Sequence, residues 1–335
     1  MSVTGIFNRA VMAAVTLFGV AVIVFCLLRI VPGDPIAMMI SPGASADDIL
    51  ALKVKYGLDS SIPVQFGVWI REMLTGDFGT SISLKRPVLS LLMERLPATL
   101  ELAFAALVFG VIGGGLIAIL ATLARRTPLE SIIDVLNGLF LAVPDFVWAL
   151  LLVLVLGVAF PIFPTSGRVD PSLSGDFTTN FYLIESLVTL RFSLFFNVLS
   201  HMVMPVLALG LPLAAVIIRT LKEALNEAML QDYVLLARLK GMSETRLVVQ
   251  ETLRNAIGPT LTLTGVQFTF MIGGTVIVER IFSYPGIGNM AIDAVINRDL
   301  PLIQGIVLMF GLIFVLINIA IDLAGNFFNP RLKHG

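Results

Sequence analysis

Six apolar runs, each long enough to cross a bilayer, constrain this chain more than any other feature. They lie at Ala10–Leu28, Leu102–Ala124, Val135–Phe163, Leu199–Ile218, Ile257–Val278 and Leu300–Ile321. About 20 apolar residues in a helix cover the roughly 30 Å of hydrocarbon in a bilayer. Backbone amides in lipid must be hydrogen-bonded within their own segment, so the runs predict helices and exclude an open sheet. The sequence therefore predicts an all-α membrane protein with six transmembrane helices.

Composition excludes several classes of function. Only 13% of the 335 residues are charged, against roughly 25% in soluble domains. The net charge of −1 gives no field that would gather nucleic acid. Cys26 has no second cysteine with which to form an internal disulfide, and His201 and His334 are too few and too far apart for a zinc site. We expect no metal site and no catalytic residues.

Basic residues close to the apolar runs set the predicted orientation. The loops on the two sides of the membrane contain about equal numbers of lysine and arginine residues. The positive-inside rule, however, gives more weight to basic residues in short loops near the spans. The basic residues near the spans fall on one side: Arg9, Arg125, Arg126, Arg219, Lys222, Arg238, Lys240, Arg246, Arg254, Arg331 and Lys333. We assign that side to the cytoplasm. Both termini are then cytoplasmic, and the two long loops Pro32–Pro97 and Pro164–Asn197 lie outside.

The first outer loop has too much pattern for a linker. Asp47–Lys53 and Val64–Leu74 have the spacing of amphipathic helices. Gly76–Ser81 has turn residues, and Val88–Leu96 is predicted to be a helix that ends at Pro97. We expect this loop to form a small folded cap.

The inner segment Thr220–Pro259 is longer than a simple connection between two spans. Its apolar residues at helical spacing predict an amphipathic helix: Leu221, Leu225, Ala228, Met229, Leu236 and Leu239. Gly241 follows as a C-cap would, and Ser243 can cap a second helix. The pattern predicts a helical hairpin. Spacing alone fits a docking element and a self-contained surface hairpin equally well.

Short motifs along the chain resemble one protein family. DYVLLARLKGMSETRLVVQETLRNAIGP, from Asp232 to Pro259, resembles the cytoplasmic loop of the permeases of peptide-class ATP-binding-cassette importers. The likeness continues in VPGDP (31–35), YGLD (56–59), GDFGTS (76–81), ERLPATLEL (94–102), ERIFSYPGIGNM (279–290), RDLPLIQGIVLM (298–309) and NPRLKHG (329–335). One departure is Leu235-Leu236-Ala237, where the general loop signature has acid-alanine-alanine.

The resemblance implies a membrane-spanning permease subunit of a binding-protein-dependent importer in the bacterial inner membrane, which translocates dipeptides or oligopeptides by alternating access. It implies as partners a second homologous permease, two cytoplasmic ATP-binding subunits, a periplasmic or lipid-anchored solute-binding protein and membrane lipid. ATP and magnesium would bind to the ATPase partners, since no lysine here is followed by Ser or Thr, as a phosphate-binding loop requires. This chain would therefore hold no cofactor and would not be an enzyme.

The resemblance also implies the domain boundaries and the coupling residues. Residues 1–31 would form an anchor helix, 32–97 the outer cap, 98–326 the permease domain with a coupling loop at 220–256, and 327–335 a cytoplasmic tail. The residues expected to couple to the ATPases are Ala237, Arg238, Lys240, Gly241, Ser243, Arg246 and Glu251.

Two carboxylates are candidates for lining the translocation pathway, and one turn is a candidate functional element beside them. Asp145 interrupts the third run, where a charge exposed to lipid is costly, so we expect it to line the translocation pathway. Alternatively it caps a local break at Pro144 or pairs between helices. Glu279 would line the outer mouth or snorkel to the interface. It lies beside an outer turn with Pro285, Gly286 and Gly288.

Other functions stay open from the sequence. Permeases with similar motifs carry nickel chelates, opines, glutathione or sugars. An autonomous ion-coupled transporter or an intramembrane enzyme would also explain Asp145, but no internal repeat and no second catalytic group is visible.

Overall fold

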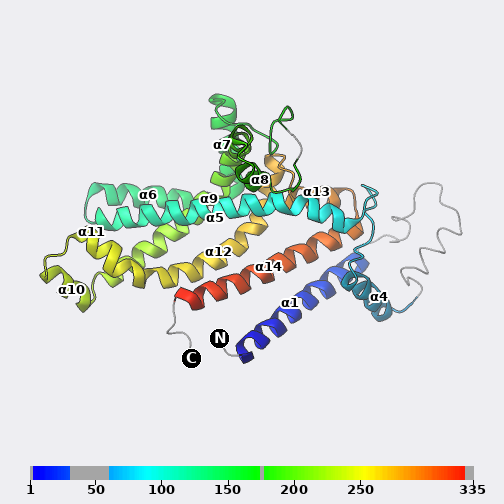
Figure 1. Ribbon diagram of the computed structural model, residues 1–335, viewed down its shortest axis with the longest axis horizontal. Coiled ribbons are helices and arrows are strands. Elements are labelled where there is room, and N and C mark those ends of the chain that lie inside the picture. The colour runs from blue at the N-terminus through cyan, green and yellow to red at the C-terminus, as the bar shows by residue number, and fades with distance from the viewer. Residues whose placement is uncertain (1–2, 31–59, 174–176, 329–335) are drawn as a thin grey trace. The chain divides into compact units, whose positions relative to one another are not determined.

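The computed structural model describes residues 3–30, 60–173 and 177–328. The predicted helix at 47–53 and the motifs at 31–35, 56–59 and 329–335 lie outside these residues. The described chain is helical, without β-strands, and has one isolated bridge between Thr80 and Pro87. Figure 1 labels its helices. The described residues divide into two compact units, one within residues 1–96 and 289–316 and the other within 97–288 and 317–335.

The first unit contains α1, α4, α13 and the beginnings of α5 and α14. The bounds of these helices are α1 Val3–Ile30, α4 Ile62–Leu74, α5 Val88–Leu123, α13 Ile287–Ile296 and α14 Leu300–Phe328. Aromatic rings join α1 to α4, with the centroids of Phe25 and Phe66 5.2 Å apart. The amphipathic helix predicted at Val64–Leu74 is thus present as α4.

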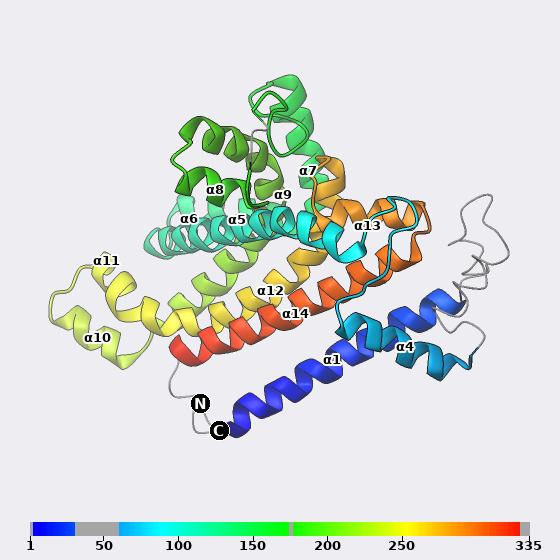
Figure 2. The same cartoon turned by 45° about the vertical axis from the view of Figure 1, so that its right-hand side comes forward.

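The second unit is built around α9. Its helices, besides the rest of α5 and α14, are α6 Pro128–Ala142, α7 Asp145–Leu152, η1 Val153–Ala159, α8 Tyr182–Val188, α9 Phe192–Ala228, α10 Asp232–Leu239, α11 Glu244–Arg246, η2 Leu247–Thr252 and α12 Leu253–Ile281. α9 contacts α6, α7, α8 and α12 (Figure 2). With 37 residues it is about 55 Å long at 1.5 Å per residue. It is therefore longer than the hydrocarbon core is thick.

In the described ranges, four helices are long and apolar enough to cross a membrane. They are Val88–Leu123, Phe192–Ala228, Glu244–Ile281 and Leu300–Ile321, and the bent pair Pro128–Ala142 with Asp145–Ala159 would make a fifth. These positions match five of the six predicted runs. The first run lies in α1, whose apolar stretch Val11–Cys26 is shorter. The count of six spans stays a prediction.

The third predicted span is not one helix. α6 and α7 meet at an angle of 103°. Val143 (φ −95°, ψ 121°) and Pro144 (ψ 153°) are extended. The proline ring disfavours helical geometry at the residue before it, which is consistent with the extended Val143 and the turn of the chain there.

The helix predicted to end at Pro97 does not end there. α5 runs from Val88 to Leu123 with Pro97 inside it. Leu92 before the proline and Ala98 and Leu102 after it are fully buried. Packing on both sides therefore holds a helical path that the local sequence disfavours.

Candidate functional site

The inner hairpin differs from its predicted form. α9 ends at Ala228 and α10 begins at Asp232, so the single amphipathic helix predicted over Leu221–Leu239 is broken in two. The break changes which residues face inward. Leu236 and Leu239 are 56% and 80% exposed, whereas Val234 and Ala237 are buried. The predicted apolar face therefore holds for α9 and is wrong for α10.

α10 folds back onto η2 around a glycine. Gly241 has φ +84°, which confirms the predicted C-cap because this conformation favours glycine. Val234 and Ala237 pack against Leu247. Ser243 holds the N-cap position of α11, but its hydroxyl makes no capping bond. Leu247 N instead donates to the Ser243 carbonyl at 3.0 Å.

One ion pair closes the turn. Arg238 Nε donates to Glu244 Oε1 at 2.8 Å and Arg238 Nη2 donates to Oε2 at 3.0 Å. Both side chains are partly exposed, so the pair adds little to the free energy of folding. Its main effect is to fix the conformation of the turn between α10 and α11. Glu244 was not among the predicted coupling residues.

The other predicted coupling residues lie on both sides of this turn. Lys240 is exposed at the end of α10. Arg246 Nε donates to Gln250 Oε1 at 2.7 Å, and Glu251 is half-buried on η2. Ala237 faces the interior of the hairpin and has only 9% of its surface exposed.

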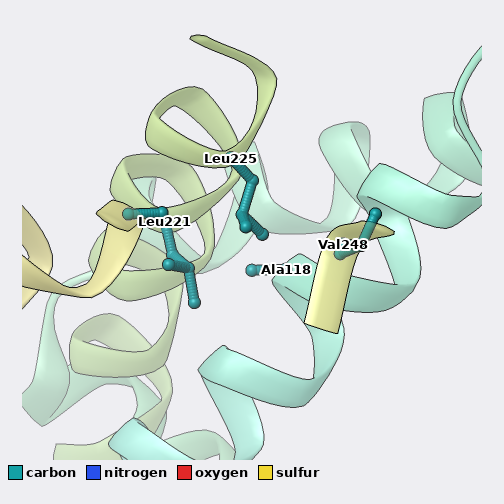
Figure 3. Close-up of a cluster of buried hydrophobic side chains, with 5 residues drawn as sticks. Ala118, Leu221, Leu225 and Val248 are labelled. Carbon is teal, nitrogen blue, oxygen red and sulfur yellow. The ribbon is translucent and has the colours of Figure 1, made fainter. Parts of the chain in front are cut away.

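The base of the hairpin is packed tightly against the long helices. Ala118 of α5, Leu221 and Leu225 of α9, Val248 of η2 and Ala256 of α12 form one buried cluster (Figure 3). This cluster includes side chains from α9, which precedes the hairpin in the chain, and from α12, which follows it. A displacement of the hairpin would therefore be transmitted to α9 and α12, because a close-packed cluster resists compression.

A charged contact joins α9 to α6 near the same end. Lys222 Nζ lies 2.9 Å from Glu130 Oε1 and 2.7 Å from Asp134 Oδ1. One cation thus bridges two carboxylates on successive turns of α6. From the sequence, Lys222 is only one of the basic residues that indicate the orientation, because these carboxylate partners are 88 or more residues away.

Asp145 lies at the first turn of α7, directly after the bend. Its Oδ1 accepts a hydrogen bond of 2.8 Å from Phe146 N, and its Oδ2 rests against Gly274 of α12, where an added Cβ would be 2.3 Å away. The carboxylate borders a cavity of about 360 Å³ whose lining also includes Leu209, Leu213, Gln267, Phe270 and Met271. The structure thus shows both the break at Pro144 and a cavity beside Asp145.

Glu279 does not line an open passage. Its side chain has no exposed surface, and Oε1 accepts a 2.7 Å hydrogen bond from Thr99 Oγ1. Ile287 N donates to the same hydroxyl at 2.8 Å. Side chains at Gly286 and Gly288 would collide with the carboxylate. In this structure the turn that contains Pro285 closes over Glu279, and a position of Glu279 at the mouth of the pathway stays a prediction.

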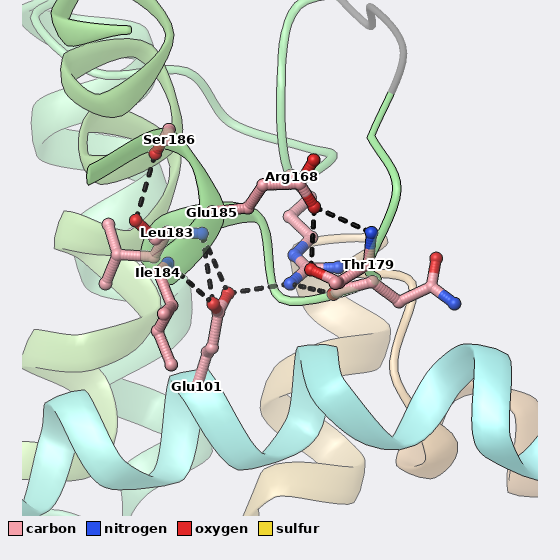
Figure 4. A network of polar contacts seen from close by, with 8 residues as sticks. Glu101, Arg168, Thr179, Leu183, Ile184, Glu185 and Ser186 are labelled. Carbon is pink, nitrogen blue, oxygen red and sulfur yellow. Dashed lines mark hydrogen bonds and ion pairs between the residues drawn. The ribbon is translucent and has the colours of Figure 1, made fainter. Parts of the chain in front are cut away.

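A buried ion pair that no sequence pattern predicts joins α5 to the loop before α8. Arg168 Nη2 lies 2.7 Å from Glu101 Oε2, and both side chains are less than 5% exposed. Glu101 also accepts from Leu183 N and Ile184 N at the start of α8 (Figure 4). Arg168 lies 4.0 Å from the Tyr182 ring centroid. Glu101 is in the ERLPATLEL motif, but no local pattern names a partner 67 residues away.

A second carboxylate orders the loop before α8. Glu185 accepts hydrogen bonds from the hydroxyl and the amide of Thr179 at 2.6 and 2.7 Å (Figure 4). It also accepts one from Thr178 N at 2.8 Å. These bonds, with that from the Thr179 hydroxyl the strongest, lower the pKa of Glu185 from 4.5 to about 2. Glu185 is thus a structural anion that ties α8 to the loop before it.

The described side chains offer no metal site. Among residues 3–30, 60–173 and 177–328, no three His, Cys, Asp or Glu side chains gather as a metal would require.

Several apolar helices of spanning length and a folded hairpin define a multi-pass membrane protein. The family of binding-protein-dependent transport system inner membrane components matches residues 110–334, and the N-terminal part of such components matches residues 3–103. The chain belongs to this family of transport permease subunits.

Relatives extend over nearly the whole chain. It is 33% identical to the di/tripeptide transport system permease protein DppB of Pseudomonas aeruginosa, covering 95% of each chain. It is also 33% identical to the glutathione transport system permease protein GsiC of Salmonella choleraesuis, again over 95% of each. A solved structure of the MetNI methionine ABC transporter shares the fold, with a TM-score of 0.55 at 15% identity, over 71% of this chain and 96% of that one.

Proposed function

We propose that this chain is the membrane subunit through which an ATP-driven importer moves short peptides across the bacterial inner membrane. Relatives named for dipeptide, di/tripeptide and glutathione transport support a peptide-like substrate. Nickel chelates, opines and sugars are the alternative cargoes within the same class of importer.

The outward face of the hairpin is the observation that carries this proposal. Leu230, Leu235, Leu236 and Leu239 are each more than half exposed, in a segment that carries charged residues and lies beyond the apolar part of α9. Apolar side chains gathered at an exposed element are typical of a protein contact. We propose that each of two cytoplasmic ATPases docks on such a hairpin, one on this chain and one on a second, similar permease.

The coupling residues follow from this arrangement. Lys240, Arg246 and Glu251 would contact or orient the ATPase, while Arg238, Gly241 and Ser243 would hold the turn in shape. Ala237 would act from inside, through its packing against Leu247. Closure of the ATPases on ATP and magnesium would push the hairpin, and the cluster at its base would pass the movement to α9 and α12.

The proposed topology has six spans with both termini and the hairpin in the cytoplasm. The domains would be the anchor helix 1–31, the outer cap 32–97, the permease domain 98–326 with its coupling loop 220–256, and the tail 327–335. The outer cap would face a solute-binding protein. The bend at Pro144 would place Asp145 in the aqueous pathway, because a carboxylate facing lipid would cost roughly 2.5–3.5 kcal/mol.

The hairpin contact can be tested by changing its surface without changing its core. Leu236→Ser with Leu239→Ser removes exposed apolar groups, and Leu187→Ser on α8, itself 51% exposed, is the matched control. We expect the double variant to lose copurifying ATPase subunits and peptide uptake while the control keeps both. Normal ATPase copurification with the double variant would remove the hairpin as the docking element.

A further inference from the structure

The cavity beside Asp145 has an unusual distribution of polar groups. Its lining is mostly apolar, and among its lining residues only Asp145 and Gln267 have polar side chains. In the described part of the chain, Asp145 Oδ2 accepts no hydrogen bond from another protein group. The side-chain amide of Gln267 also has no hydrogen-bond partner there. A mostly apolar cavity with a few polar groups that have no hydrogen-bond partner within the protein is typical of a small-molecule site.

The two polar groups lie at opposite ends of one helix face. Gln267, Met271 and Gly274 follow one another at spacings of four and three along α12, so they share a face. Seven residues separate Gln267 from Gly274, which is about 10 Å along the axis at 1.5 Å per residue. Because Asp145 Oδ2 rests on Gly274, its carboxylate marks one end of this face and Gln267 marks the other.

This spacing matches a short peptide. An extended chain covers at most about 3.3–3.6 Å per residue, so two to three residues span about 7–10 Å. Phe270 and Met271 lie between the polar ends and also line the cavity. An extended di- or tripeptide could therefore reach from Asp145 to Gln267 with apolar side chains beside it.

We propose that Asp145 and Gln267 form a subsite that recognises the free N-terminal ammonium group and the far end of a di- or tripeptide in transit. This inference rests on the peptide-transport function proposed above. Asp145 would accept a charge-assisted hydrogen bond from the ammonium. The Gln267 amide would donate to a carbonyl or carboxylate oxygen.

One end of the subsite carries a charged side chain, Asp145, and the other end a neutral one, Gln267. No lysine, arginine or histidine lines the cavity, so a peptide carboxylate finds a neutral partner while the ammonium finds a charged one. Blocking the amino end therefore removes the stronger contact. N-terminal acetylation should slow translocation far more than C-terminal amidation.

The test uses the complete complex in proteoliposomes, with its binding protein saturated by each peptide. Maximal uptake rates are compared for dialanine, N-acetyl-dialanine and dialanine amide, so that the affinity of the binding protein does not enter the ratio. We expect wild type to move dialanine at least about tenfold faster than the acetylated peptide, equal to about 1.4 kcal/mol. In Asp145→Asn this ratio should fall to near one. Asp170→Asn makes the same charge change at an exposed position outside the cavity and should keep the wild-type ratio.

A second variant covers the case in which Asp145→Asn fails to assemble. Gly274→Ala keeps the charge but places a methyl group where Oδ2 now rests, which displaces the carboxylate and should also reduce the ratio. An unchanged ratio in either assembled variant overturns the subsite. If the wild-type complex moves no peptide at all, the proposed function fails instead, and the two failures are thus distinguished.

Discussion

The Ser81 hydroxyl donates a hydrogen bond of 2.6 Å to Asp299 Oδ2, although 218 residues separate them in the sequence. Ser83 donates to the same oxygen through its amide at 3.0 Å and its hydroxyl at 2.7 Å. Asp299 Oδ1 accepts from Leu302 N at the start of α14 at 3.3 Å. The GDFGTS and RDLPLIQG motifs therefore meet at one buried carboxylate within the first unit.

Replacing Asp299 should destabilise the first unit. Asp299→Ala removes a helix cap, worth about 0.5–2 kcal/mol, and leaves the buried Ser81 hydroxyl without its acceptor. We expect a loss of about 2 kcal/mol or more, measured by thermal unfolding of the purified protein in detergent. Glu94→Gln removes an exposed pair with Arg86 and should change stability by less than about 0.5 kcal/mol. Equal effects of the two changes would contradict the structural role of Asp299.

The hairpin turn should depend on the backbone of Gly241 and not on space around it. Its φ is +84°, and an added Cβ would meet nothing within 4 Å. Gly241→Val should therefore cost about 1–2 kcal/mol of local backbone strain and uncouple ATP hydrolysis from uptake, with membrane insertion intact. Gly241→Asn is the control, since asparagine tolerates this conformation, and it should keep most coupling. Wild-type uptake and ATPase binding in Gly241→Val would contradict the lever role.

The buried pair of Glu101 and Arg168 should show strong coupling between mutations. Arg168→Met leaves the Glu101 carboxylate buried without its cation, which costs roughly 3–5 kcal/mol. Adding Glu101→Gln removes that charge and should restore part of the stability. A double-mutant cycle followed by thermal unfolding measures the coupling. Additive effects would mean that the pair does not interact in the folded protein.

Acid should loosen the segment around α8 through Glu185. Its folded pKa of about 2 is below its ordinary value of 4.5, so its contribution to stability is present above pH 4.5 and is lost as the pH falls towards 2. The protection factors of the Thr178 and Thr179 amides, which correct the exchange rates for their intrinsic pH dependence, should therefore fall as the pH decreases through this window. In Glu185→Gln the protection factors of the same amides should already be lower at neutral pH and should change little on acidification. Wild-type protection that stays constant down to pH 2 would contradict the assignment.

Accessibility can decide whether Asp145 faces water. In a Cys26→Ala background, Asp145→Cys should react with a small hydrophilic thiol reagent, and the rate should change when ATP is trapped in the partner subunits. A cysteine at Ala149 of α7, which is fully buried, should stay unlabelled. Protection of position 145 in every state, with uptake retained in Asp145→Asn, would remove it from the pathway.

Local sequence was enough to predict the positions of most helices. The runs within α5, α9, α12 and α14 are long and apolar, and length with hydropathy is a local property. The C-cap at Gly241 was predicted for the same reason, because a left-handed residue after a basic turn is a local signature. The motifs carried the family, and with it the class of transporter.

The pairings required the tertiary structure. Glu101 with Arg168 and Ser81 with Asp299 join residues far apart in the chain, and no periodicity encodes a partner at such a distance. The outward leucines of α10 were mispredicted because the break after Ala228 resets the helical phase, so a face extrapolated from α9 pointed the wrong way.

Two prolines show where local rules stop. Pro144 turns the chain by 103°, whereas Pro97 lies inside a continuous helix. Both rings exclude the same hydrogen bond and disfavour a helical residue before them, so the sequence treats them alike. The difference lies in their surroundings. Pro97 is itself buried and is followed by the buried residues Ala98 and Thr99, whereas Pro144 lies among residues that are exposed or half-buried. Packing around Pro97 supplies free energy that helps to keep α5 helical through its proline.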